Sequence, residues 1–134
     1  MKHITLGKLF ELYVDIFDKF GLYLIKENDQ MIEYYIFETT DINIGYCSNR
    51  ILTIFLENGI IDEEIFDKSS EFLEKFRALE RTTLKWNIDL IRQSFEWKQL
   101  MILSDRIKKK IENKWTDKEL EEIFELDQLV DLEI

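Results

Sequence analysis

The sequence predicts a mainly α-helical protein, a compact bundle of five or six helices that forms a single helical domain over residues 1–134. Its 134 residues include no proline and only four glycines, the two residue types that most often interrupt helices. Apolar residues recur at three- and four-residue steps along much of the chain, which is the period of an amphipathic helix. A hydrophobic content of 46%, with 13% aromatic residues, is sufficient for one buried core in a chain of this length.

The first helix is expected over residues 5–20. Its apolar positions form one stripe, made by Leu6, Leu9, Phe10, Tyr13, Val14, Phe17 and Phe20. Glu11, Asp15 and Asp18 fall on the opposite face. Gly21 follows at the position where a left-handed cap would end the helix.

Residues 22–47 permit two interpretations. Apolar positions 31, 32, 35 and 36 follow a helical step, and Asn28 precedes them as a cap or turn residue. The aromatic and β-branched cluster at residues 34–37 also favours a strand. We expect a helix, with a short strand or irregular element as the alternative, and a loop over residues 39–45.

Capping residues begin the next two helices. Ser48 is placed to cap a helix to about residue 58, which Gly59 ends. Asp62 is placed to cap the following helix, where Glu63 and Glu64 lie favourably at the positive end of the helix dipole.

The last part of the chain is expected to form one long helix and one short one. Asn87 caps the long helix, which runs to about residue 114 with Phe95 in its apolar stripe. Thr116 and Glu119 have the spacing of a capping box and open the final helix. Residues 126–134 are expected to fray.

The residue content excludes several kinds of chemistry. Cys47 is the only cysteine, so the chain forms no internal disulfide and no cysteine zinc site; we expect a small buried hydrophobe in a reduced compartment. His3 is the only histidine, which excludes two-histidine metal sites and histidine-dependent catalytic triads. We therefore predict no catalytic, cofactor-binding or metal-binding residue and a protein that is not an enzyme. An unrecognised carboxylate site remains the alternative.

Membrane insertion is also disfavoured. No apolar run reaches the roughly 18–20 residues that span a bilayer, and the N-terminal apolar positions are broken by acids, unlike a secretory signal. These features predict a cytoplasmic protein with no membrane partner.

The charge distribution is the strongest functional signal. The chain carries 18 Lys and Arg against 28 Asp and Glu, a formal net charge of −10, which disfavours direct binding to nucleic acid. Glu64, Asp67, Glu71 and Glu74 step by three, four and three residues, so they share one helix face. That face is either ordinary solvated surface or a docking surface for a basic partner.

A second acidic stretch covers residues 117–133. It contains eight acids and only Lys118 as a base, and Glu121, Glu122 and Glu125 are its candidate partner-binding residues. The alternative interpretation is a solubilising tail.

The remaining charged and aromatic features have structural explanations. Consecutive lysines at 108–110 fan around a helix and favour its C-terminal dipole, so they make no focused basic patch. The tryptophans at 86, 97 and 115 and the five tyrosines are core or interface residues, and the sequence does not separate these roles.

Four stretches resemble the immunity proteins of polymorphic toxin systems, such as contact-dependent growth inhibition. They are FLENGIID at 55–62, SFEW at 94–97, LSDRIK at 103–108 and WTDKEL at 115–120. The resemblance implies a bacterial protein that binds the C-terminal toxin domain encoded by a neighbouring gene, commonly a basic nuclease. Its partner would be neutralised by occlusion of the active site or substrate groove.

Two other functions compete with this expectation. One is another acidic protein-binding inhibitor or adaptor, such as a phage-type inhibitor of a nucleic-acid enzyme. The other is the enzyme with an unrecognised carboxylate site. The sequence leaves the identity of the toxin and the oligomeric state open.

Overall fold

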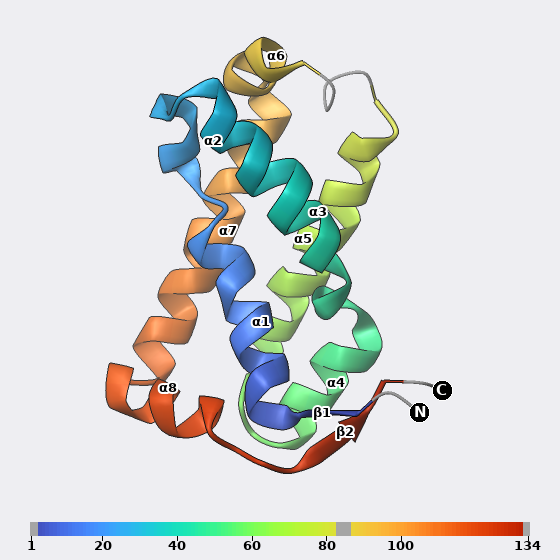
Figure 1. Cartoon of the computed structure of the whole chain (residues 1–134), viewed down its shortest axis with the longest axis vertical. Helices are drawn as coiled ribbons and strands as arrows, with labels where there is room; N and C mark the ends of the chain where they lie inside the picture. The colour runs from blue at the N-terminus through green and yellow to red at the C-terminus, as the bar shows by residue number, and fades with distance from the viewer. Residues whose placement is uncertain (1–2, 83–86, 133–134) are drawn as a thin grey trace.

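The mainly α-helical class is confirmed by the computed structural model, which describes residues 3–82 and 87–132 (Figure 1). The framework consists of α1 (Leu6–Asp18), α4 (Asn49–Glu57), α5 (Glu63–Glu80), α7 (Phe95–Lys114) and α8 (Asp117–Phe124). Helices α5 and α7 pack antiparallel, since Phe76 meets Trp97 and Glu64 meets Lys110. Helix α8 packs on α1 at the lower end of the bundle in Figure 1.

Helix α1 supplies the centre of the core. Its predicted apolar stripe is confirmed, because every member is buried except Val14, which is half-buried. The ring of Phe10 lies 5.3 Å from that of Phe55 on α4, and the ring of Phe17 lies 5.4 Å from that of Phe72 on α5. Edge-to-face geometry of this kind is favourable for aromatic pairs.

The predicted N-caps at Asn28, Ser48, Asp62, Asn87 and Thr116 are confirmed. In each case the side chain accepts a hydrogen bond from a backbone N–H three residues later, at distances from 2.8 to 3.4 Å. These bonds satisfy donors that the first turn of a helix would otherwise leave unpaired. The stop at Gly59 is also confirmed, with a left-handed φ of 71°.

The predicted left-handed cap at Gly21 is wrong. Helix α1 ends at Asp18, and Gly21 is extended with φ −166°. A Cβ at Gly21 would lie 2.4 Å from an Asp105 carboxylate oxygen, and the other oxygen of that carboxylate accepts from the backbone N–H of Leu22 at 3.1 Å. The glycine therefore allows α7 to approach the chain closely.

Residues 22–47 are helical, so the preferred interpretation was correct and the alternative strand was not. The segments are a 3-10 helix (Leu22–Lys26), α2 (Asp29–Glu33), a π-helix (Tyr34–Thr40), α3 (Asp41–Asn43) and a second 3-10 helix (Ile44–Cys47). The prediction of a loop at residues 39–45 was wrong, because these residues are helical. Thr40 is buried and its hydroxyl donates to the Tyr35 carbonyl at 2.7 Å, a five-residue spacing that matches the wide π turn.

The single long helix expected after Asn87 is broken into two. Helix α6 (Ile88–Gln93) stops at Ser94, whose extended backbone and side chain cap α7 through the Trp97 N–H. Phe95 is consequently 69% exposed and does not belong to a buried stripe. Serine is a strong N-cap, and this local preference outweighs the continuous helical pattern.

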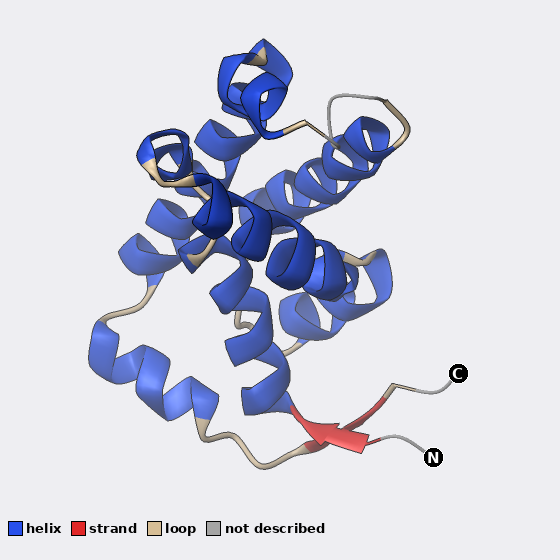
Figure 2. Ribbon diagram, turned by 45° about the horizontal axis from the view of Figure 1, so that its top comes forward, coloured by secondary structure: helices blue, strands red, loops and turns tan. Residues whose placement is uncertain are grey.

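Residues 126–132 are ordered, contrary to the expected fraying. Strand β2 (Leu129–Asp131) pairs antiparallel with β1 (His3–Thr5), which brings the two ends of the described chain together (Figure 2). The Arg50 guanidinium donates to the Leu132 carbonyl at 2.9 Å and to the Asp131 carbonyl. His3 is exposed.

The C-terminal segment also accepts hydrogen bonds from the first backbone N–H groups of α1. The Leu6 N–H donates to the Gln128 carbonyl at 2.7 Å, and the Gly7 N–H donates to the Leu126 carbonyl at 3.0 Å. A Cβ built on Gly7 would lie 2.2 Å from the Phe124 carbonyl oxygen. Only glycine therefore permits α8 to sit this close to α1.

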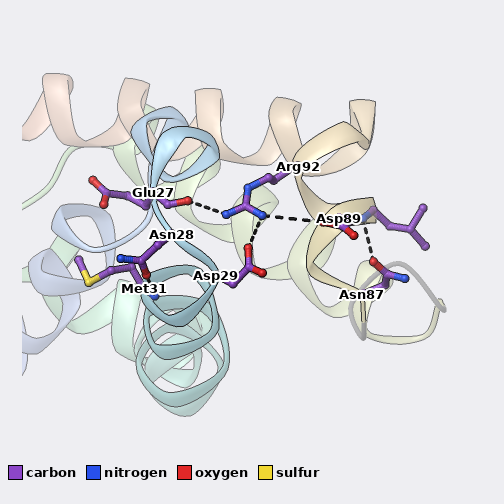
Figure 3. A network of polar contacts seen from close by, with 8 residues as sticks. Glu27, Asn28, Asp29, Met31, Asn87, Asp89 and Arg92 are labelled. Atoms are coloured by element: carbon purple, nitrogen blue, oxygen red, sulfur yellow. Dashed lines mark hydrogen bonds and ion pairs between the residues drawn. The ribbon is translucent and has the colours of Figure 1, made fainter.

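Arg92 connects α6 to the turn before α2 (Figure 3). Its Nη2 donates to the Glu27 carbonyl at 2.6 Å, its Nη1 contacts the Asp29 carboxylate, and Asp89 lies further away at 3.9 Å. The partly buried guanidinium thus joins α6 to residues 27–29.

We predict that Gly7→Ala destabilises the protein by about 1–3 kcal/mol, because the added methyl group overlaps the backbone of α8. Gly45→Ala is the matched control, since a Cβ there meets nothing within 4 Å, and we expect a change within about 0.5 kcal/mol. Urea unfolding followed by circular dichroism measures both. Equal stability of the two variants would contradict the close approach.

We further predict that Arg92→Met lowers the free energy of unfolding by about 1–3 kcal/mol, because two charge-assisted contacts between α6 and residues 27–29 are lost. Asp89→Asn removes the 3.9 Å contact and the acid in the first turn of α6, and should cost less than about 1 kcal/mol. Chemical denaturation of both variants separates the two effects.

Candidate functional site

The predicted acidic face of α5 exists as a geometric feature. Glu64, Asp67, Glu71 and Glu74 are all exposed, on the side of the helix away from the buried Ile65, Phe72 and Phe76.

Neighbouring cations neutralise part of this face. Lys110 of α7 lies 2.5 Å from Glu64, and Lys75 lies 3.8 Å from Glu71. Among the described residues, no cation lies within ion-pair distance of Asp67 or Glu74. The face is therefore of mixed charge, with two free carboxylates rather than four.

The lysines at 108–110 fan around α7, as predicted. Lys108 lies 3.2 Å from Asp18 of α1, whereas Lys110 pairs with α5. Lys114 lies over the Trp115 ring, 5.1 Å from the ring centroid. These contacts between helices are structural, and they divide the basic cluster between two sides of α7.

The acids of α8 are less compensated. Glu121, Glu122 and Glu125 are exposed, and no ion pair forms to any of them within the described parts of the chain. The helix is folded and capped, because Thr116 and Glu119 form the predicted capping box. The acids therefore project from an ordered helix that packs on α1, which argues against a loose acidic tail.

A groove lies between α1, α7 and α8, with a volume of about 320 Å³. Its apolar lining is formed by Val14, Phe17, Ile111, Leu120 and Phe124. Its polar lining is formed by Asp18, Lys108, Glu112 and Asp117. This groove, called the α8 groove below, combines an apolar floor with an excess of carboxylates, and Glu121 lies one helical turn after Asp117 on α8.

The two acidic sets predicted from the sequence lie on different parts of the bundle. Helix α5 packs against α7 and α4, whereas α8 packs against α1. The structure thus separates them into two surfaces. The α8 groove lies along the second, and another groove, lined by charged side chains that include Glu64, lies beside the first.

The nucleophilic and hydroxyl groups of the core are inaccessible. Cys47 is fully buried, as predicted, and burial raises the pKa of its thiol, which therefore stays protonated at neutral pH. Tyr13 is also fully buried, burial raises its pKa, and its hydroxyl lies 2.6 Å from that of Ser69. Within residues 3–82 and 87–132, no cluster of three potential metal ligands occurs.

The structure assigns the aromatic residues that the sequence left open. Trp97 is a core residue, and Trp115 is half-buried with its indole N–H donating to the Ile60 carbonyl at 2.8 Å. Trp86 lies outside the described residues. Tyr34 is exposed, and Tyr23 is partly exposed. Desolvation of the covered part of Tyr23, together with nearby Tyr35 and acidic groups, raises its pKa to about 12.

Sequence reasoning did not identify the apolar floor of the α8 groove. Val14 and Leu120 lie in regular helical stripes, and a stripe does not show which of its flanks a neighbouring helix leaves uncovered. The groove depends on how far α8 stands from α7, which no local pattern encodes.

Comparisons with protein-family models, curated proteins and solved structures found no match to this chain. Across the described residues, none of the helices combines the length and the apolar character needed to cross a bilayer.

We predict that the Glu119 carboxyl titrates below the ordinary glutamate pKa of about 4.3. The Thr116 backbone N–H donates to the carboxylate at 2.9 Å and stabilises its charged form. A lowered pKa in the folded state means that this contribution to α8 is present at neutral pH and is lost as the pH falls through the folded pKa. NMR titration of the side-chain carboxyl carbon measures the midpoint, and Thr116→Val should move it upwards. A midpoint at or above the ordinary value in the parent protein would contradict the capping box.

Proposed function

We propose that this chain is an immunity protein that binds a cognate toxin domain with a basic surface and neutralises it by covering its active site or substrate groove. The supporting observation is that α8 and its C-cap residue carry exposed carboxylates that make no ion pair among the described residues, on a helix whose Leu120 and Phe124 line a groove with an apolar floor. The toxin domain would be encoded by a neighbouring gene, and neutralisation would take place in the cytoplasm of the producing cell.

The charge of the protein favours a basic partner. A net charge of −10 produces a field that attracts a cationic protein and speeds association. Nucleases carry positive clefts because they bind phosphates, so a surface of this sign competes for the same cleft. The attraction weakens as salt screens exposed charges, which gives the proposal a measurable signature.

The ordered acids of α8 support binding better than the face of α5. The α8 acids lie on a capped helix held against α1, so little conformational entropy is lost when a partner docks. On α5, by contrast, Glu64 and Glu71 already have cationic neighbours. We therefore rank the surface of Glu121, Glu122 and Glu125 first and the α5 face second, although in the sequence the α5 acids are the set aligned on one helix face.

The test uses the C-terminal domain encoded by the gene immediately upstream, expressed with and without this protein. We expect growth arrest that only this protein relieves, together with a stoichiometric complex that co-purifies. Absence of arrest, or arrest without rescue and without a complex, would contradict the immunity function. In that case affinity capture from the native lysate would test the other acidic inhibitor or adaptor function.

Charge reversal then tests the binding surface. We predict that Glu121→Lys with Glu125→Lys slows association roughly tenfold at low salt, because steering acts mainly on the on-rate. Asp67→Lys with Glu74→Lys makes the same change of four charges on α5 and should have the smaller effect. Surface plasmon resonance over a series of salt concentrations measures both, and a larger effect of the α5 pair would reverse the ranking.

A further inference from the structure

We infer that the α8 groove receives one apolar side chain of the partner, carried on a segment that is rich in lysine or arginine. This inference rests on the proposed function, because the partner is taken to be the toxin domain. It adds the chemistry of the segment that docks and the place where it docks.

The size and floor of the groove suit an anchoring side chain. A volume of about 320 Å³ lies at the lower end of the range of protein ligand pockets. Its floor is apolar and comes from three helices, with Val14 from α1, Ile111 from α7 and Leu120 from α8. Binding energy at interfaces concentrates where an apolar anchor fills such a pocket.

The charged residues that line the groove favour a docking segment with positive charge. Asp18 already pairs with Lys108 at 3.2 Å, but Glu112 and Asp117 make no ion pair among the described residues. These two free carboxylates come from different helices, α7 and α8, and both line the same groove. A neutral or acidic segment would cover them without compensation, whereas cations about one turn from the anchor would pair with them.

The same charges disfavour a second copy of this chain as the occupant. Each copy carries a net charge of −10, so bringing another acidic surface over Glu112 and Asp117 is repulsive. The groove around Glu64, Lys68 and Arg106 is lined by charged and amide side chains that include four cations, so it disfavours a segment rich in lysine or arginine.

The α8 groove is also held open by the fold. The C-terminal segment is tied to the start of α1 by the two backbone hydrogen bonds of Leu6 and Gly7, and α8 contacts α1 closely at Gly7. On the side formed by α1 and α7, the ion pair between Lys108 and Asp18 joins these two helices. A partner therefore meets a preformed site and does not have to order it.

The inference is tested on the full chain with the toxin domain from the rescue experiment. Val14→Trp fills the groove and Glu112→Lys reverses one free carboxylate, and we expect each to weaken the complex at least tenfold. Leu73→Trp on α5 and Glu33→Lys on α2, an exposed carboxylate outside both candidate surfaces, are the controls, and we expect changes within twofold. Circular dichroism melts establish that each variant is folded.

A cross-linking experiment does not depend on how Val14→Trp folds. The native Cys47 is fully buried, so Glu112→Cys provides one accessible thiol for a photoreactive label, and Glu74→Cys provides the matched position on α5. We expect the label at residue 112 to cross-link to a lysine- or arginine-rich stretch of the toxin domain that contains a large apolar residue. The label at residue 74 should give little product.

The outcomes distinguish the two proposals. If the parent protein forms no complex with the toxin domain, both the immunity function and the docking site are wrong. If the complex forms but tolerates Val14→Trp and Glu112→Lys, and cross-links arise from residue 74 rather than 112, the groove is not the docking site while the proposed function stands. Cross-links from residue 112 into an acidic or uncharged segment would also overturn the inference.

Discussion

The buried aromatic face of α1 is the interaction on which the other helices depend. Phe10 contacts α4 and Phe17 contacts α5, while Phe20 lies 6.2 Å, between ring centroids, from Trp97 of α7. Tyr13 adds a polar contact within this core, since its hydroxyl is 2.6 Å from that of Ser69 on α5. Helix α1 and the residues that follow it to Phe20 thus supply the shared surface against which α4, α5 and α7 are positioned, and its aromatic rings define that surface more narrowly than flexible aliphatic chains would.

The N-terminal strand and the C-terminal segment hold α8 against α1. The C-terminal segment gives carbonyl acceptors to the first N–H groups of α1, which would otherwise be unpaired, and pairs with the N-terminal strand. Arg50 of α4 then holds the carbonyls of Asp131 and Leu132. These contacts place α8 at a fixed distance from α1, so the groove and its acidic rim are consequences of how the chain ends are joined.

Ion pairs between helices determine which parts of the acidic surface remain available. Lys110 is directed to Glu64 of α5 and Lys108 to Asp18 of α1, so α7 distributes its positive charge to both sides. Helix α8 receives no comparable cation within the described chain and remains the less compensated surface. The alignment of acids on one face of α5 is therefore a poor guide to the available charge, because pairing depends partly on which helices become neighbours.

The sequence by itself determined the helical class, the buried stripe of α1, the caps such as Asp62 and Thr116, and the exposure of the candidate acids. These features depend on residues three or four apart, whose relation is set by the helix itself. Only the tertiary structure decided that Gly21 is extended, that residues 126–132 form an ordered segment ending in a strand, and that the α8 groove exists. Each of these depends on contacts between residues about 80 or more positions apart, such as Leu22 with Asp105, and local propensity carries no information about which distant surfaces meet.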